Sequence, residues 1–404
     1  MKHACLIAGA LYAAMTMPTQ AKDLFELGLS VDSAPEVREG FTTISDLFDA
    51  LSTEGLTQLS PGYTESSPAT AALYVRGLPA EASFQSGSTT LRFRVPSLGI
   101  DVSFTGETRD DSRDQFEDYI KANGGDILKR MLKELARVSP VDPVAGNPGS
   151  LMAQMGAQDF ADAASVSGNP GGTGSSGNLF GIGLGYDSNS LGPYDQNVMR
   201  LPLSFGFDLS NGYRLTLSAP IYRVESEGTD SYGASFGAAL RIPLTADWAL
   251  TPALRVGAAG SGDLGSAAAL YSGSLTSRYV WHFAGGLDLG MTNQLALYQS
   301  RSISAGDYEA DYDLSNRSLK NGLDLAGPLN GTFLGNGAQW RAWVIDTRFY
   351  GDELYSNSWQ EYGVSVGTRV QAGAIVYEQL NFGISYLNGE NDVSGLKLNF
   401  GYRF

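Results

Sequence analysis

The sequence is nearly free of the two residue types that most often carry thiol, metal and acid–base chemistry. Its single cysteine is Cys5, and its only histidines are His3 and His282, in 404 residues. Removal of an N-terminal signal, argued below, would leave no cysteine and exclude disulfides, thiol catalysis and zinc–thiolate sites. We therefore expect a protein that is not an enzyme, with no cofactor and no metal site.

Positive charge and long apolar runs are also scarce. The chain has 27 Lys and Arg against 43 Asp and Glu, a net charge of −16. Because phosphate binding needs clustered Lys and Arg, no nucleic-acid partner is expected. No stretch after the N-terminus approaches the length of a membrane-spanning helix. Glycine is abundant, with 50 residues, and since each costs about 1 kcal/mol inside a helix, a mainly helical fold is not expected.

The N-terminus has the pattern of a secretory signal. Lys2 and His3 give a basic start, residues 4–17 form an apolar run, and 19–21 offers small residues for cleavage after Ala21. The alternative, a membrane anchor, needs about 20 apolar residues. The prediction is a signal peptide over residues 1–21, and Cys5 precedes most of the apolar run, a poor position for lipidation.

The last ten residues alternate between apolar and polar or small side chains, with Leu396, Leu398, Phe400, Tyr402 and Phe404 on one face. Similar alternation recurs in segments of about ten residues, with aromatic residues near their ends. These segments are 201–209, 213–221, 232–244, 248–257, 287–297, 362–370 and 380–386. Counting from Asn178 gives about twelve, with ten or fourteen as alternatives. An exported chain without a membrane helix can span a membrane as a closed barrel.

The predicted fold class is therefore membrane all-β: an antiparallel transmembrane β-barrel of about twelve strands over residues 178–404, behind a small α+β N-terminal domain. Short turns at 210–212 and 245–247 are typical of the periplasmic side. Longer polar stretches at 225–230, 302–313 and 351–357 predict extracellular loops.

Residues 22–138 predict the small α+β domain. The expected helices and strands are a helix over 43–51, strands over 71–76, 89–95 and 100–105, and a helical region over 112–135 broken at 124–125. An apolar stripe in that region (Ile127, Leu128, Met131, Leu132, Leu135) either packs on the sheet or binds a partner. Residues 139–177 predict a further helix over 150–164 and a Gly-rich linker over 168–177.

The terminal Gly401-Tyr402-Arg403-Phe404 resembles the C-terminal signal of bacterial outer-membrane barrels. The resemblance implies that Tyr402 and Phe404 form a barrel-assembly signal, and that the chain is exported to the cell outer membrane. The barrel behind an N-terminal region is similar to the translocator unit of autotransporters, although the domain is short and shows no repeat. The partners so implied are outer-membrane lipid, the secretion machinery and the barrel-assembly machinery, and we expect a monomer.

Catalytic patterns have simpler interpretations. His282 lies in the aromatic run 279–283 and is expected in a membrane-interface belt rather than as a base, because no serine is obviously paired with it. Two Gly-x-Ser-x-Gly matches, 233–237 and 363–367, lie inside predicted strands, whereas a nucleophile needs a sharp strand-to-helix turn. The acids of 307–313 lack the spacing of a calcium loop. No catalytic residue is predicted.

Strand phase places a set of charged residues in the lumen. The inward basic residues are predicted to be Arg200, Arg214, Arg241, Arg255, Lys320, Arg348, Arg369, Lys397 and Arg403, and the inward acids Asp208, Asp288, Asp324 and Asp346. Either these charges pair with one another, or a positive surplus holds something acidic. Asp159 and Asp162, on the helix before the barrel, are the nearest acidic candidates.

A barrel of about twelve strands is too wide for its small inward side chains to fill, since eight already suffice for filling. Residues 150–177 are therefore predicted to enter the lumen from the periplasmic side as a partial plug. The predicted function is an autotransporter-like anchor and translocator with a short N-terminal domain. The alternatives are a porin-like channel with an anion preference, and an adhesive or structural surface protein.

Overall fold

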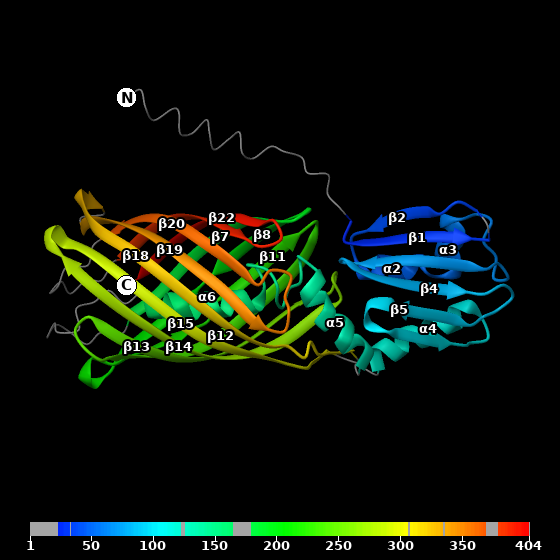
Figure 1. Ribbon diagram of the computed structural model, residues 1–404, viewed down its shortest axis with the longest axis horizontal. Helices are drawn as coiled ribbons and strands as arrows, with labels where there is room; N and C mark the ends of the chain where they lie inside the picture. Colours follow the sequence, from blue (N-terminus) through cyan, green and yellow to red (C-terminus); the bar gives the residue numbers. More distant parts are fainter. Residues whose placement is uncertain are drawn as a thin grey trace, which may run out of the picture.

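The computed structural model describes residues 23–32, 34–122, 126–164, 179–305, 308–333, 336–368 and 379–403. A small domain and a β-barrel lie end to end (Figure 1). The predicted signal peptide, the linker 168–177, Arg369 and Phe404 lie outside the described residues, and for Tyr402 and Arg403 the description covers the backbone alone.

The N-terminal domain is built on a six-stranded antiparallel sheet in the order β2-β1-β3-β4-β5-β6. Its strands are β1 (Phe25–Val31), β2 (Val37–Phe41), β3 (Ala69–Val75), β4 (Leu78–Phe84), β5 (Leu91–Val95) and β6 (Ile100–Phe104). Alternation in β1 buries Phe25, Leu27 and Leu29 on one face and leaves Glu26 and Gly28 on the other. The period of two thus gives the sheet one apolar face that must be covered.

Four helices supply that cover: α2 (Ile44–Ala50), α3 (Thr53–Leu59), α4 (Arg109–Ala122) and α5 (Asp126–Val138). The side chain of Thr43 caps α2 by accepting a hydrogen bond from the Asp46 backbone N–H, and Ser52 caps α3 in the same way from Gly55. The stripe predicted on α5 packs into the core of the domain through Leu128, Leu132 and Leu135. It is core, and not a free partner-binding face.

The second sheet has fourteen segments and closes on itself. They are β7 (Leu179–Leu191), β8 (Tyr194–Leu201), β9 (Leu203–Asp208), β10 (Arg214–Ser218), β11 (Ile221–Ser226), β12 (Thr229–Pro243), β13 (Trp248–Ser261), β14 (Ser266–Phe283), β15 (Leu287–Arg301), β18 (Ser315–Phe333), β19 (Asn336–Gly351), β20 (Ser358–Thr368), β21 (Gln379–Gly389) and β22 (Val393–Arg403). A short hairpin of β16 (Ile303–Ala305) and β17 (Tyr308–Ala310) lies in one connection.

Two pairs of these segments are single barrel strands interrupted by proline, which has no N–H for the ladder. Pro202 separates β8 from β9, and Pro220 separates β10 from β11. Counting each pair as one strand gives a closed antiparallel barrel of twelve strands. The last strand, β22, pairs with the first, β7, in a register that runs from Val393 opposite Leu191 to Arg403 opposite Gly181. The predicted barrel is confirmed.

Large apolar side chains form the outer surface of the barrel. Leu254, in the middle of β13, is 74% exposed, and Phe236, Leu297 and Val364 are also more than half exposed. A protein in water does not present so many large apolar side chains together, whereas a lipid-facing band requires them. No helix in the described part of the chain is long and apolar enough to cross a membrane.

The barrel has two distinct ends. The turn end carries the tight turns 210–212 and 245–247 together with the first and last barrel residues, and the domain end carries the connections 262–265, 302–314 and 351–357, on which the N-terminal domain sits (Figure 1). The expected loop at 225–230 is absent, because β11 and β12 continue to a two-residue turn at Glu227 and Gly228, both with positive φ. Such turns match the twist of a hairpin.

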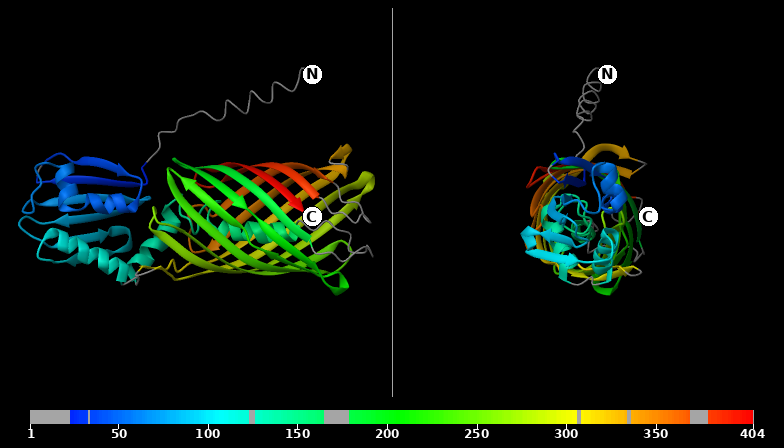
Figure 2. Two further views of the ribbon diagram at one scale, coloured as in Figure 1. Left: turned by 180° about the vertical axis from the view of Figure 1, so that it is seen from behind. Right: turned by 90° about the vertical axis from the view of Figure 1, so that its right-hand side faces the viewer.

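Residues 139–150 are buried at the domain end, and α6 (Leu151–Ala164) continues from them into the barrel. Figure 2 shows α6 surrounded by the barrel strands. The lumen is therefore occupied by the chain itself.

A candidate functional site in the barrel lumen

Helix α6 fills the lumen because small inward residues of the barrel leave space for it. Leu151 packs against Gly257, where an added Cβ would lie 2.9 Å from its Cδ1 atom, and Phe160 packs against Gly322, where an added Cβ would lie 2.7 Å from its ring. The helix also presents its own Gly156 to the hydroxyl of Tyr298. Glycine at these positions follows from close packing, since larger side chains would displace the helix.

The two acidic residues of α6 meet one arginine of the barrel wall. Arg255 Nε donates to Asp159 Oδ1 at 2.8 Å, and its Nη2 donates to Asp162 Oδ2 at 3.2 Å. All three side chains are almost fully buried. Among the predicted inward basic residues whose side chains the structure describes, Arg255 is therefore the one that contacts both predicted plug residues.

Serine hydroxyls complete this buried cluster. Ser218 donates to Asp162 at 2.7 Å and Ser274 donates to Asp159 at 2.9 Å. Nearby, Lys320 lies over the ring of Phe160, 5.5 Å from its centroid. Buried charges are tolerated when their partners and hydrogen bonds are all in place, so the cluster holds α6 in one position.

Other inward basic residues pair with carboxylates of the barrel wall. Arg200 contacts Asp187, Arg214 contacts Asp208, and Lys397 Nζ lies 2.9 Å from Glu361 Oε2. Arg241 stands opposite Arg214 in the strand register. Within the described residues, neither Arg241 nor Lys320 has a carboxylate at ion-pair distance. Most charged side chains described in the lumen are therefore in ion pairs. The two described basic residues without one, Arg241 and Lys320, do not bond to Asp159 or Asp162.

Sequence reasoning missed four charged lumen residues: Asp187, Arg278, Arg341 and Glu361. Arg278 Nη1 donates to Asp324 Oδ1 at 2.7 Å, and Arg341 Nε donates to Asp324 Oδ2 at 3.1 Å. The sequence could have placed three of the four in the lumen, because Asp187, Arg278 and Glu361 alternate in step with inward Gly and Ser residues of the same strands. Arg341 lacked that signal, since Trp343 and Ile345 share its inward face.

The expectation that Arg348 and Asp346 face the lumen is wrong. Arg348 Nε donates to Asp346 at 2.9 Å on the outer face, and the Arg348 side chain is 57% exposed. The opposite phase of β19 is buried and includes Thr347 and Phe349. Apolar side chains face inward there because Phe349, Tyr298 and Trp359 form an aromatic cluster inside the barrel, so hydrophobicity no longer marks the outer face.

The direction of entry also differs from the expectation. Helix α6 begins at the domain end, whereas entry was expected at the end with the tight turns, the predicted periplasmic side. The first barrel strand begins at the turn end, where Gly181 pairs with Arg403. The chain therefore passes from one mouth of the barrel to the other.

A buried polar cluster joins the N-terminal domain to the barrel mouth. Arg76, in the turn between β3 and β4, donates to Ser266 Oγ of β14 at 2.7 Å and lies 3.4 Å from Asp142 Oδ2. Tyr312 donates its hydroxyl hydrogen to the same Asp142 oxygen at 2.9 Å. Burial raises the pKa of Asp142, against the opposing effect of Arg76 and of the backbone N–H groups of Val144 and Ala145. We call these four side chains (Arg76, Asp142, Ser266, Tyr312) the docking cluster.

Further contacts surround the docking cluster. Lys129 and Lys133 of α5 form ion pairs of 3.1 and 2.7 Å with Asp311 and Asp352 of the barrel loops, and the hydrogen bond that Lys129 donates to Asp311 raises the pKa of Lys129. The backbone N–H of Ile44 donates to Asp263 at 2.8 Å. The domain is thus bonded to three separate barrel connections.

His282, the only histidine among the described residues, is mostly exposed at the turn end. Its Nδ1 lies 2.7 Å from Asp288 and its Nε2 lies 3.4 Å from Asp247. The rings of Tyr279 and Trp281, on the same strand, are tilted against each other with centroids 4.7 Å apart. Both Gly-x-Ser-x-Gly matches lie inside strands, β12 and β20. Nothing in these surroundings supplies a nucleophile to the imidazole, and the described residues hold no cluster of metal-ligating side chains.

Neither a family model nor a curated protein matches the chain. Solved structures do. The β domain of the Bordetella autotransporter BrkA is 15% identical, with a TM-score of 0.44, over 57% of this chain and 99% of that one. The translocator domain of the autotransporter NalP from Neisseria meningitidis is 13% identical, with a TM-score of 0.44, over 63% and 95%. The KdgM porin is 13% identical, with a TM-score of 0.34, over 55% and 99%.

These likenesses are distant, and the barrel stands on its own strand pairings. The chain forms a closed antiparallel β-barrel with a lipid-facing apolar surface. Its lumen holds a helix of the same chain, and one mouth is covered by its N-terminal domain.

Proposed function

We propose that this protein is an autotransporter-like anchor that displays its own N-terminal domain at the cell surface and keeps it docked on the barrel. The observation that carries the proposal is the path of the chain. The domain lies at one mouth, α6 lies in the lumen, and the first barrel strand begins at the other mouth.

The connections between strands support an orientation for the barrel. Barrels of this class carry short turns on the periplasmic side and longer connections outside the cell. The turn end has the tight turns 210–212 and 245–247 and the connection 369–378, while the domain end has the two-residue turns 192–193 and 227–228 and the longest connection, 302–314. The position of this longest connection favours a surface location for the domain.

The docked position distinguishes this domain from a passenger that is released. Its docking cluster is buried: Arg76 donates directly to Ser266 of the barrel and pairs with Asp142, which accepts a hydrogen bond from Tyr312. Breaking a buried ion pair costs about 3–5 kcal/mol, so detachment would be unfavourable. In this proposal the chain is exported through a cleaved signal over residues 1–21 and inserted by the barrel-assembly machinery, with Tyr402 and Phe404 as the assembly signal.

An open channel is the second candidate function, but the helix that fills the lumen argues against it. The helix is held by Arg255 through Asp159 and Asp162, and its apolar residues Leu151, Met152 and Met155 are fully buried. An anion-preferring pore would need a continuous wet path. We expect low conductance from the intact protein in a planar bilayer and a large increase for a chain that starts near residue 177.

Protease treatment of intact cells tests the display. An epitope tag placed before Asp23 should be removed by added protease in intact cells. A second tag in the turn 210–212, at the opposite end, should be cleaved only after the outer membrane is permeabilised. Protection of the first tag together with cleavage of the second would reverse the orientation and refute display.

A further inference from the structure

We propose that the N-terminal domain binds the acyl chain of a lipid-like amphiphile in an apolar cavity next to the barrel mouth. The cavity measures about 360 Å³ and lies between the sheet and the helices of the domain. Ligand sites in proteins measure about 300–1,000 Å³, so this space is large enough for a ligand. The inference goes beyond the proposed display function and needs only the membrane-embedded barrel.

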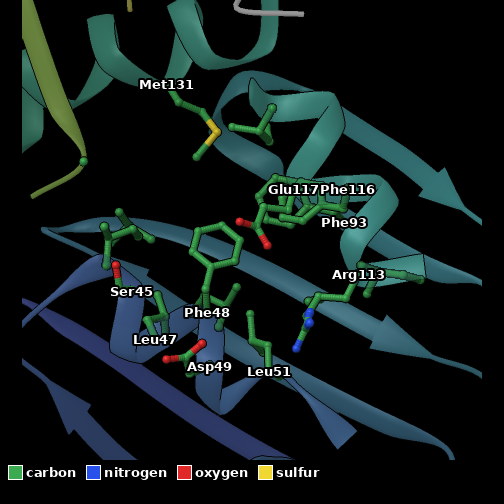
Figure 3. A pocket seen from close by; sticks show the side chains of 18 of the residues that line it. Ser45, Leu47, Phe48, Asp49, Leu51, Phe93, Arg113, Phe116, Glu117 and Met131 are labelled. Carbon is green, nitrogen blue, oxygen red and sulfur yellow. The ribbon is translucent and has the colours of Figure 1, made fainter. Parts of the chain in front are cut away.

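The walls of the cavity are hydrocarbon. The inner face of the sheet forms its floor, with Phe93 among the residues, and Phe48 of α2, Phe116 of α4 and Met131 of α5 line its sides (Figure 3). The ring centroids of Phe93 and Phe116 are 4.6 Å apart, and those of Phe48 and Phe116 are 6.1 Å apart. The thioether of Met131 adapts to ligands of irregular shape because its side chain is flexible.

The polar side chains of the lining decide which part of a ligand can enter. The deepest of them, Arg76, is already bonded to Ser266 and Asp142. Arg113 is held by Asp114 at 2.7 Å. A ligand atom that needs a hydrogen bond would lose it inside, at a cost that a hydrocarbon chain avoids. The enclosed part of the ligand is therefore an aliphatic chain.

The barrel supplies one wall of the same cavity. Leu264, in the connection between β13 and β14, lines the cavity and is 2% exposed. The barrel-facing end of the cavity is thus also lined by an aliphatic side chain. Because the barrel is embedded in lipid, acyl chains are the apolar ligands available beside this mouth, and a bound chain would contact both the domain and the barrel.

The charged residues of the lining do not select a headgroup. Figure 3 shows Asp49, Glu117 and Arg113 among the side chains that line the cavity, and Arg76 is the fourth charged residue of the lining. Two carboxylates and two guanidiniums carry no net charge. We therefore assign the site to the acyl chain of a single-chain amphiphile, such as a lysophosphatidylethanolamine, with its headgroup outside the cavity.

Photo-cross-linking of the full-length protein in phosphatidylcholine nanodiscs tests the assignment. The probe is a lysophosphatidylethanolamine with a diazirine near the methyl end of its chain. Saturable labelling of the peptides that contain Phe48, Phe116 or Met131 is expected. Labelling confined to the outer surface of the barrel would overturn the proposal.

Adjacent residues of β3 provide a matched pair of variants. Ala71 lines the cavity, whereas Ala72 lies on the opposite, exposed face of the sheet. The added side chain of Ala71→Leu should abolish labelling of the cavity peptides, and Ala72→Leu should leave it unchanged. Ala82→Leu, which enters from β4, repeats the test in case the first variant fails to fold. Equal labelling of folded Ala71→Leu, Ala82→Leu and Ala72→Leu proteins would refute the site.

Two competition arms test the ligand class. Unlabelled lysophosphatidylethanolamine and a fatty acid with the same chain should both displace the probe, whereas glycerophosphoethanolamine, which has the headgroup and no chain, should not. Displacement by glycerophosphoethanolamine would overturn the acyl-chain assignment. Displacement by an apolar peptide, with none by the lysolipid, would make the cavity a peptide site and refute the acyl chain.

Discussion

Replacing Arg255 with leucine should release α6 from the lumen. The change removes the cation that Asp159 and Asp162 share and leaves their two carboxylates buried, while the hydrogen bonds from Ser218, Ser274 and Gln158 remain. Removing one partner of a buried ion pair costs about 3–5 kcal/mol, because the remaining charge has no counterion. Leucine keeps most of the apolar volume, so the loss falls on the charge interaction.

The expected size of the effect follows directly. At about 1.4 kcal/mol for each factor of ten, the population with α6 displaced rises by about a hundredfold to several thousandfold. Hydrogen–deuterium exchange of the backbone amides in peptides from residues 151–164 measures this population, since exchange requires the helix to open. Exchange of the β13–β14 strands reports whether the barrel itself stays intact.

A triple variant separates charge from packing. Arg255→Leu combined with Asp159→Asn and Asp162→Asn removes the cation and both charges, so α6 should return close to its protected state. If the single variant folds and its α6 amides exchange as slowly as in the unaltered protein, the reasoning is refuted. Equally fast exchange in the single and triple variants would assign the effect to packing and would also refute it.

Three further outcomes are expected. Arg76→Ala should open the docking cluster and speed proteolysis within residues 139–150, while Arg92→Ala, which breaks an exposed pair with Asp101, should change it little; equal rates would contradict a fixed domain. Leu254→Arg, in the outer apolar band, should lower the free energy of unfolding by about 2–4 kcal/mol, seen as a smaller folded fraction in heat-modifiability gels, and Leu254→Phe should not. A fully folded arginine variant would argue against a lipid-facing surface. Gly322→Val should push on Phe160 and loosen α6, detected as faster amide exchange in the helix with an unchanged barrel; unaltered exchange would show that the contact is not tight.

Local patterns in the sequence were sufficient to predict the barrel and most of its strands. The alternation of β12, β13 and β22 matches the register of the closed sheet, because a strand with lipid on one side must repeat every second residue. Helices α4, α5 and α6 were equally visible, since they depend on helical spacing of apolar residues within short stretches of the chain. These features are decided by residues close together in the chain.

The alternation of apolar and polar residues predicted the wrong inward face for β19, where the lumen is apolar. In β19 the aromatic side chains of Trp343 and Phe349 face inward, and Arg348 faces outward. The rule that apolar residues face lipid holds only when water or polar groups fill the interior. Here α6 and an aromatic cluster fill part of it, and that filling depends on the tertiary structure.

The tertiary structure also decided which charges meet. Arg255 lies 96 residues from Asp159 and 93 from Asp162, and Arg76 lies 190 residues from Ser266. Spacing within one strand cannot place such partners, because their depth in the barrel depends on the stagger of all the strands and on the end at which the chain enters. The sequence by itself predicted a lumen with charges and free space and a helix before the barrel that enters it. Only the closed barrel, with the domain bonded to its mouth, determined the end at which that helix enters and that Arg255 holds it.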